Sequence, residues 1–224
     1  MNLVKKIYSN TTIGKIFHTL VNCLQNELLD CETVLDLGCG PDSPIKYCKN
    51  INNSIGVEAF KPYLTRSQNS HIHTKYLHDK IENINFPEKS FDAIILIEVI
   101  EHLTQEEGQK IIVKAEKWAK KKVIISSPNG FLLQHAVDNN PHQRHLSGWT
   151  YEKMQLLGYK CHGLAGLRVF RRETQSNTMG DDLLVSIRWW PKPFWFAIAT
   201  LSQPLSYYLP RLAFELFCVK NIKA

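Results

Sequence analysis

Two glycines and two acids in the first quarter of the chain have the types and spacing of a nucleoside-binding site. In VLDLGCGPD, Asp36, Gly38 and Gly40 follow an apolar run, and Glu58 ends the next such run. Glycine lacks a Cβ atom, so the backbone turns tightly and a ligand can approach it closely. A carboxylate at the end of the neighbouring strand can accept both hydroxyls of a ribose. The pattern predicts a bound nucleoside, with a tight turn that holds no ligand as the alternative.

The same stretch lacks the motifs of two other nucleotide sites. A dinucleotide motif, GxGxxG, would need a third glycine where Ser43 stands. The phosphate-binding motif GxxxxGK[ST] is absent from the sequence. A dinucleotide or a nucleoside triphosphate is therefore not the expected ligand.

A second group of residues that could do chemistry follows the third apolar run. In EVIEHL, Glu98, Glu101 and His102 lie within five residues, and a helical turn there would put positions i and i+3 on one face. Loop residues further on, His142 or His145, can add an imidazole. Carboxylate and imidazole ligands suit several divalent ions. The alternatives make His102, with Glu101, a general base, or let the pair cap or pack under the next helix.

Alternating apolar and amphipathic stretches must position these residues. This alternation predicts βαβ units and a mostly parallel sheet, whose strands bring their carboxyl ends to one edge. Residues 160–172 add one or two late strands. The expected strands are 33–38, 54–60, 91–100 and 122–130, and the expected helices are 13–24, 105–121 and 150–159.

Composition and charge narrow the class of protein. A chain of 224 residues with 44% hydrophobic residues predicts one domain, with room for an appendage. The net charge of +6 permits contact with phosphate or an anionic membrane and requires neither. Six cysteines form no CxxC pair, and MNLVKKIYSN lacks the apolar segment of a secretory signal. Reduced thiols and a cytoplasmic location are expected.

Four motifs together resemble the class I S-adenosylmethionine-dependent methyltransferases of the type 11/23 kind. They are VLDLGCG, SIGVEAF, FPEKSFDAIILIEVIEHL and KKVIISSPNG, and they cover roughly residues 30 to 130. The resemblance implies an α/β, Rossmann-like fold with a seven-stranded, mostly parallel sheet, flanking helices and S-adenosylmethionine as cofactor.

The same resemblance assigns roles to single residues. It places Asp36, Gly38 and Gly40 on the methionine side of the cofactor and Glu58 on the ribose. It matches Asp79 to the acid that meets the adenine amine. The stretch after Asp79 is one residue longer than usual, so a loop aspartate that makes a turn is the alternative.

EVIEH also resembles the E-x-x-E-H motif of metal-dependent small-RNA 2′-O-methyltransferases. These enzymes have a later histidine before a tryptophan, and HLSGW places His145 in that role. The resemblance implies Glu98, Glu101, His102 and His145 as ligands of a divalent metal ion. The stretch NNPHQRH departs from the surroundings found in the RNA enzymes, and no RNA-binding module is visible.

Three functions follow from these motifs. The leading hypothesis is O-methylation of a small molecule or a glycan, since residues 126–166 also resemble bacterial methyltransferases suspected of acting on surface saccharides. The first alternative is RNA methylation, which the charge allows but for which no aromatic and basic interleaving is present. The second alternative is a protein that binds S-adenosylmethionine without chemistry, against which the intact glycine motif argues.

The C-terminal segment differs in composition from the rest. We expect a methyltransferase domain over residues 1–188, including the N-terminal helix, and an apolar, aromatic, helical extension over 189–224. Gln203, Arg211 and Glu215 disfavour a membrane-spanning helix. Its tryptophans and tyrosines fit either a lid over the acceptor pocket or peripheral contact with a membrane.

Overall fold

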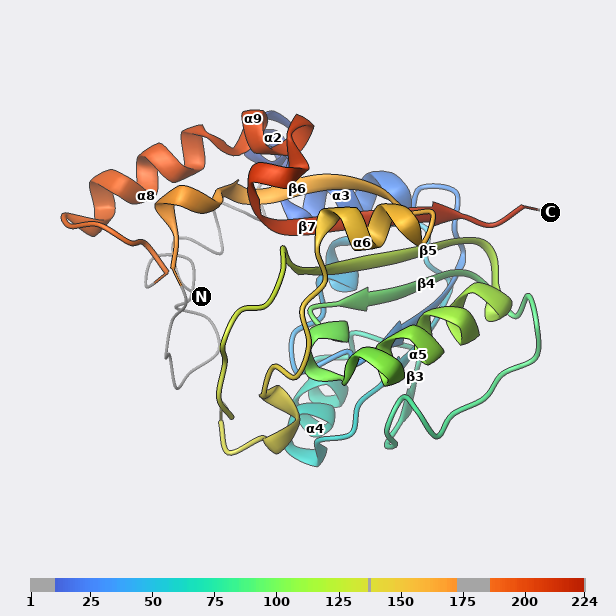
Figure 1. Cartoon of the computed structure of the whole chain (residues 1–224). Coiled ribbons are helices and arrows are strands. Elements are labelled where there is room, and N and C mark those ends of the chain that lie inside the picture. The colour runs from blue at the N-terminus through green and yellow to red at the C-terminus, as the bar shows by residue number, and fades with distance from the viewer. Residues whose placement is uncertain (1–10, 137, 173–185, 224) are drawn as a thin grey trace.

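A seven-stranded sheet forms the centre of the computed structural model, which describes residues 11–136, 138–172 and 186–223 (Figure 1). The strand order is β3-β2-β1-β4-β5-β7-β6. The five strands from β3 to β5 run parallel, and β7 runs antiparallel to both of its neighbours. The strands are β1 Thr33–Leu37, β2 Asn53–Val57, β3 Lys75–Leu77, β4 Phe91–Ile97, β5 Ala119–Pro128, β6 Lys160–Leu167 and β7 Ala213–Asn221. The expected α/β, Rossmann-like fold is confirmed, with a mixed sheet.

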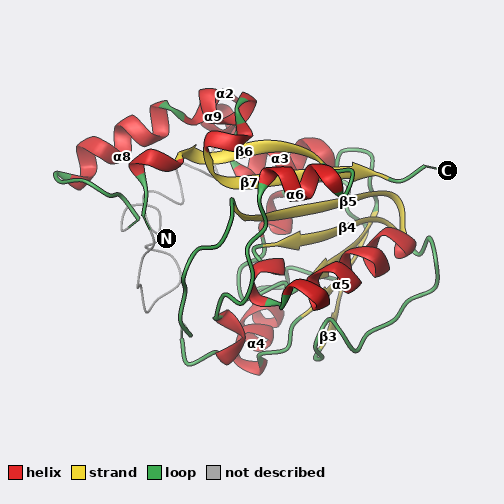
Figure 2. Ribbon diagram, in the orientation of Figure 1, coloured by secondary structure: helices red, strands yellow, loops and turns green. Residues whose placement is uncertain are grey.

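Apolar cores form on both faces of the sheet, and helices cover them (Figure 2). Successive strand residues point to opposite faces. In β4, Ile94 belongs to the core that includes residues of α5, and Ile95 to the core that includes residues of α3. The helices are α2 Thr11–Phe17, α3 Leu20–Glu27, α4 Lys61–Asn69, α5 Gln105–Trp118, α6 Tyr151–Leu156, α8 Lys192–Leu201 and α9 Gln203–Tyr208.

Helix α5 supplies its own N-terminal cap. The Thr104 side chain accepts a hydrogen bond from the backbone N–H of Glu107, whose carboxylate accepts from the Thr104 N–H in return. This capping box satisfies backbone donors at the helix start. His102 and Glu101 precede the cap and are not needed for it, so the helix-capping alternative for these residues is wrong.

The end of the chain corrects the expectation of a helical extension. Helices α8 and α9 form as expected, but Ala213–Asn221 is strand β7, which lies between β5 and β6 in the sheet. Leu216 faces one apolar core and Phe217 the other, because a strand inside a sheet is covered on both faces. A boundary at residue 189 would separate this strand from its sheet. None of the described helices is long and apolar enough to cross a bilayer.

Candidate active site

A cavity of about 500 Å³ lies at the carboxyl ends of the parallel strands. Its wall includes Gly38 and Gly40 after β1, Glu58 after β2, and Glu98 at the end of β4. Residues of α3, β6, α9 and β7 complete it. Ligands of open α/β sheets bind in this position, outside the strand ends.

The glycine turn after β1 needs its glycines for geometric reasons. Gly38 and Gly40 have φ angles of +70° and +57°, a region that residues with a side chain enter at a cost. A Cβ atom on Gly38 would lie 2.7 Å from Cγ2 of Val99. A Cβ on Gly40 would meet no atom within 4 Å, so the backbone there borders open space that a ligand can fill.

Glu58 is tied to the same turn. Its carboxylate accepts hydrogen bonds from the backbone N–H of Gly40, at 3.0 Å, and of Phe60, at 2.7 Å. The side chain is buried, and burial raises its pKa, while these two hydrogen bonds oppose the shift. The structure thus brings Gly38, Gly40 and Glu58 together at the cavity wall, the arrangement that the nucleoside prediction requires.

Two other residues predicted to bind the cofactor lie elsewhere. Asp36 is buried beneath the glycine turn, where it accepts a hydrogen bond from Ser43 Oγ at 2.6 Å and lies 3.3 Å from His73 Nε2. Asp79 is exposed and does not line the cavity. It accepts hydrogen bonds from the Lys80 N–H and from Asn83, the loop turn given as its alternative role.

Glu98 occupies a strained position at the end of β4. Its φ angle is +55°, which is uncommon for a residue other than glycine. Two contacts with Ser126 on β5 hold it there: the Glu98 N–H donates to Ser126 O at 3.0 Å, and Ser126 Oγ donates to Glu98 Oε1 at 2.7 Å. Backbone strain of this kind is often found at functional sites.

A 3-10 turn over Ile100–His102 carries the next two candidate residues, and the segment before α6 is pinned to it. The carbonyl oxygen of Glu101 accepts hydrogen bonds from the N–H groups of Leu146, at 2.8 Å, and Ser147, at 3.1 Å. Trp149, fully buried, donates its indole N–H to Ile100 O at 3.1 Å. These contacts bring His145 next to the turn.

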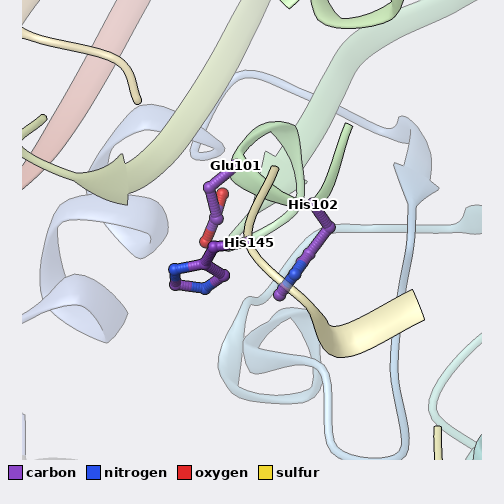
Figure 3. A group of neighbouring side chains, drawn as sticks. All are labelled: Glu101, His102 and His145. Atoms are coloured by element: carbon purple, nitrogen blue, oxygen red, sulfur yellow. The ribbon is translucent and has the colours of Figure 1, made fainter. Parts of the chain in front are cut away.

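Glu101, His102 and His145 form one cluster, shown in Figure 3. One ligand-type atom from each lies within 4.8 Å of the others. The Nδ1 atoms of His145 and His102 lie 2.7 Å from Leu132 O and 3.3 Å from Arg144 O, respectively. Carbonyl oxygens only accept, so Nδ1 carries the proton in each ring and Nε2 is left with its lone pair. His142, the alternative to His145, is exposed and outside the cluster.

None of the cluster's side chains carries a positive charge near neutral pH. Burial, with a smaller contribution from Glu215, raises the pKa of Glu98 to about 8. Burial and the charge of Glu98 raise the pKa of Glu101 well above its usual value. Burial and the neighbouring His145 lower the pKa of His102 to about 4. Among the described residues, no hydrogen-bond donor reaches either carboxylate oxygen of Glu101.

These residues have the chemistry of a metal site. Neutral imidazoles and closely spaced carboxylates are the ligands that divalent transition metals and Mg²⁺ take from proteins. A buried carboxylate without a donor is costly unless a cation compensates it. The donor set and the unsatisfied oxygens of Glu101 therefore fit a divalent ion.

Glu215 is a residue of the cavity that the sequence did not indicate. It lies on β7 and lines the cavity near Glu98. In the sequence it was only a charge that disfavours membrane insertion. A signal was present: in FELFCV one acid interrupts an apolar run. Placing it at the site requires knowing that this run returns to the centre of the sheet.

A comparison with protein families decides the class of protein. Residues 35–126 match a family described as a methyltransferase domain. The chain carries a class I S-adenosylmethionine-dependent methyltransferase domain. The family implies S-adenosylmethionine as the methyl donor, and the open backbone at Gly40 beside Glu58 fits its nucleoside part. The family expected from the sequence motifs is therefore confirmed.

Solved structures share the fold of this methyltransferase at low sequence identity. An S-adenosylmethionine-dependent methyltransferase from Archaeoglobus fulgidus has a TM-score of 0.53 and 16% identity, covering 94% of this chain and 98% of its own. The methyltransferase domain of bacterial CtHen1-C has a TM-score of 0.53 and 17% identity, covering 96% and 100%. The PH0226 protein of Pyrococcus horikoshii has a TM-score of 0.53 and 13% identity, covering 96% and 93%. No curated protein sequence matches the methyltransferase significantly.

Proposed function

We propose that this methyltransferase methylates a hydroxyl oxygen of a small molecule or a glycan, and that Glu98, Glu101, His102 and His145 hold a divalent metal ion beside the acceptor. The observation that carries the proposal is the cluster of Glu101, His102 and His145 in the wall of the cavity that also contains the glycine turn. Bound S-adenosylmethionine supplies an activated methyl group. A divalent ion in the cluster would lower the pKa of an acceptor hydroxyl.

The residues of the chain have separate tasks in this proposal. Gly38 and Gly40 contact the methionine side of the cofactor, and Glu58 binds and orients its ribose. The apolar wall, with Leu132, Leu164 and Phe214 among its residues, excludes water and limits the orientations open to an acceptor. Holding two reactants in a fixed orientation accounts for much of the acceleration that such an enzyme needs.

The role of His102 follows from its surroundings. A general base works best when its pKa lies near the working pH, and burial holds the pKa of His102 at about 4. A metal ligand must be a neutral imidazole, and this low pKa keeps the ring neutral. Because Nδ1 is protonated beside Arg144 O, Nε2 is the atom of His102 that would hold an ion. These features favour His102 as a ligand over His102 as the base.

The charge of the cavity favours a small molecule or glycan over a nucleic acid. Its described lining contains five acids and neither lysine nor arginine. Binding a phosphodiester depends on cationic side chains near the phosphates. The acids of the wall can hold a metal ion, and the described lining offers no cationic side chain to a phosphate backbone. RNA remains the alternative acceptor because of the E-x-x-E-H motif. The acids are Asp42, Glu58, Glu98, Glu101 and Glu215.

The proposal is tested by metal analysis and activity on a panel of acceptors. Protein purified without chelator is analysed for metals, then assayed by release of S-adenosylhomocysteine with glycosides, catechols, aliphatic alcohols and short RNAs. We expect about one ion per chain, and activity on a hydroxyl acceptor that is lost in EDTA and restored by one of Mg²⁺, Mn²⁺, Co²⁺ or Zn²⁺. Full activity in chelator would refute the metal, and methylation of RNA alone would refute the acceptor class.

A matched pair of variants separates the site from general damage. Glu101→Gln removes a buried carboxylate of the cluster, and Glu106→Gln makes the same change at an exposed position on α5. We expect Glu101→Gln to lose the metal and to lose activity while it still binds S-adenosylhomocysteine. Glu106→Gln should behave as the unmodified chain. Retention of metal by Glu101→Gln would contradict the assignment.

A further inference from the structure

Helices α8 and α9 expose apolar side chains at helical spacing. In α8, positions 194, 197 and 201 recur every three or four residues, and in α9 positions 205 and 208 are three apart. Residues at these spacings share one face of a helix. The large exposed side chains on these two helix faces and just before α8 are Trp190, Phe194, Leu201, Leu205 and Tyr208, with exposed fractions of 85%, 57%, 70%, 53% and 70%.

The fully buried residues of the same helices are small or polar. They are Ala199, Gln203 and Ser206. Gln203 Oε1 accepts a hydrogen bond from the Gly166 N–H, and Ser202 Oγ accepts one from the Leu167 N–H at 3.0 Å. Both helices therefore attach to β6 through polar groups as well as through Tyr207, whose ring stacks on His162 with centroids 4.2 Å apart.

Glycines on β6 allow the two helix backbones to approach. A Cβ atom on Gly166 would lie 2.2 Å from the carbonyl oxygen of Ala199, and one on Gly163 would lie 2.1 Å from that of Ser206. A helix on a globular protein normally turns its apolar face inward. Here large apolar side chains point outward as well as inward, and close backbone contact with β6 fixes the two helices on the sheet.

The charged side chains in and around α8 and α9 are all basic. Residues 186–214 contain Arg188, Lys192 and Arg211, and no aspartate or glutamate. Arg211 contacts Glu152 on α6 at 3.0 Å, and the exposed Arg188 adjoins the exposed pair Trp189 and Trp190. Apolar and tryptophan side chains beside basic ones match the boundary of an anionic bilayer, where the rings enter the headgroup region and the cations face lipid phosphates.

We propose that Trp190, Phe194, Leu201, Leu205 and Tyr208 form a membrane-docking face that binds the surface of an anionic lipid bilayer. Helix α8 has ten residues and lies at the outer end of the molecule, away from α5 and β3 (Figure 1). It is too short to cross the hydrocarbon core, so it rests in the interface. Gln203 of α9 lines the cavity, so docking brings the cavity close to the lipid surface.

Flotation with lipid vesicles tests the docking face. The full chain is mixed with phosphatidylcholine vesicles, with or without about a third of phosphatidylglycerol, and centrifuged through a density gradient. We expect flotation with the anionic vesicles at low salt and much less with phosphatidylcholine alone, because lipid charge adds to apolar insertion. Failure to float with the anionic vesicles at low salt would overturn the proposal.

Matched variants identify the side chains that contact the lipid bilayer. The triple variant Trp190→Ser, Phe194→Ser, Leu201→Ser removes three of the five side chains of the docking face. The control Leu29→Ser, Val113→Ser, Leu156→Ser removes side chains exposed by 62%, 54% and 89% elsewhere. The first should lower the partition coefficient at least about tenfold, and the second should leave it unchanged. Circular dichroism checks that both are folded. Equal flotation of the first variant and the unmodified chain would contradict the proposal.

Two further measurements test the contribution of Arg188 to lipid binding and the alternative that a second copy of the chain covers the docking face. Arg188→Glu should lower binding to anionic vesicles at least about fivefold, whereas Lys160→Glu, the same change at an exposed site on β6, should have little effect. Light scattering reports whether a second copy covers the face instead. A dimer that the triple variant abolishes, without flotation of the unmodified chain, would overturn the lipid assignment.

Discussion

The imidazole rings of His102 and His145 lie with their centroids 4.8 Å apart, and each ring turns its Nδ1 atom to a backbone carbonyl oxygen. One ring follows β4 and the other belongs to the loop before α6. Two imidazolium ions at this separation would repel each other, and burial lowers the pKa of both rings. The pair is thus held neutral, as ligands of a metal ion must be.

Exchanging each loop histidine in turn should identify the imidazole that completes the metal site. His145→Gln should lose the bound metal and the metal-dependent activity, because it removes a buried member of the cluster. His142→Gln makes the same change in the same segment and is the control, because His142 is exposed and outside the cluster. Metal analysis of the two purified proteins is the measurement. Equal metal content in both would remove His145 from the ligand set.

The metal-free protein should lose stability as the pH rises from 6.5 to 8. Burial raises the pKa of Glu98 to about 8 and that of Glu101 well above the value of about 4.3 in an unfolded chain. In this interval the folded state binds more protons than the unfolded state, so the free energy of unfolding falls with pH. His102 and His145, with lowered pKa values, oppose this trend near pH 6.5, where the same imidazoles in an unfolded chain are about half protonated, and contribute little near pH 8.

A divalent ion should reverse this fall in the free energy of unfolding with rising pH, because it binds the deprotonated carboxylates. At a hundredfold excess over its Kd, Mn²⁺ should raise Tm by about 5–10 °C at pH 8. The increase at pH 6.5 should be smaller. Thermal unfolding of the full chain measures both, and Glu101→Gln should abolish the Mn²⁺ effect. An unchanged Tm at both pH values would argue against the site.

Gly38→Ala should abolish binding of S-adenosylhomocysteine. The new Cβ would press on Val99 in a backbone conformation that disfavours side chains, and the turn must move. Gly158→Ala is the control, because Gly158 also has a positive φ, +85°, but lies after α6 and outside the cavity lining. Both changes should cost about 1–2 kcal/mol of stability. Calorimetry on the folded proteins should show loss of binding only for Gly38→Ala; equal affinities would argue against a cofactor at this turn.

Glu58→Ala should weaken binding of S-adenosylhomocysteine by about 1.5–3 kcal/mol, the contribution of hydrogen bonds to a charged group. Removing the carboxylate also leaves the Gly40 and Phe60 N–H groups without their acceptor. Glu32→Ala, at an exposed position before β1, is the matched control. Isothermal titration gives both affinities. A Glu58→Ala affinity equal to that of the control would exclude the ribose contact.

The cofactor half of the site could be predicted because its signals are local. Glycines directly after a buried strand must turn at the sheet edge, and an acid ending the next strand must lie beside them. The structure places Gly38, Gly40 and Glu58 in this way. The sequence did not show that Asp79 turns outward, because that depends on its hydrogen bonds with Lys80 and Asn83.

The remaining features depend on contacts between distant parts of the chain. Spacing alone left His142 and His145 equivalent, and the choice rests on the hydrogen bonds of Leu146 and Ser147 to Glu101 O. Glu215 joins the cavity because β7 enters the sheet between β5 and β6. The apolar, aromatic run after residue 189 was expected to form short helices separated by prolines, and its last part, Ala213–Asn221, is a strand because it packs between β5 and β6.

A crystal structure of the full chain with S-adenosylhomocysteine and Mn²⁺, with anomalous scattering recorded for manganese, tests the central claim most directly. The claim is that one cavity holds the cofactor beside a metal ion. We predict an anomalous peak among Glu101, His102 and His145, with Glu98 nearby, and the nucleoside between the Gly38–Gly40 turn and Glu58. An empty cluster at saturating Mn²⁺, or a nucleoside bound away from Glu58, would contradict the account.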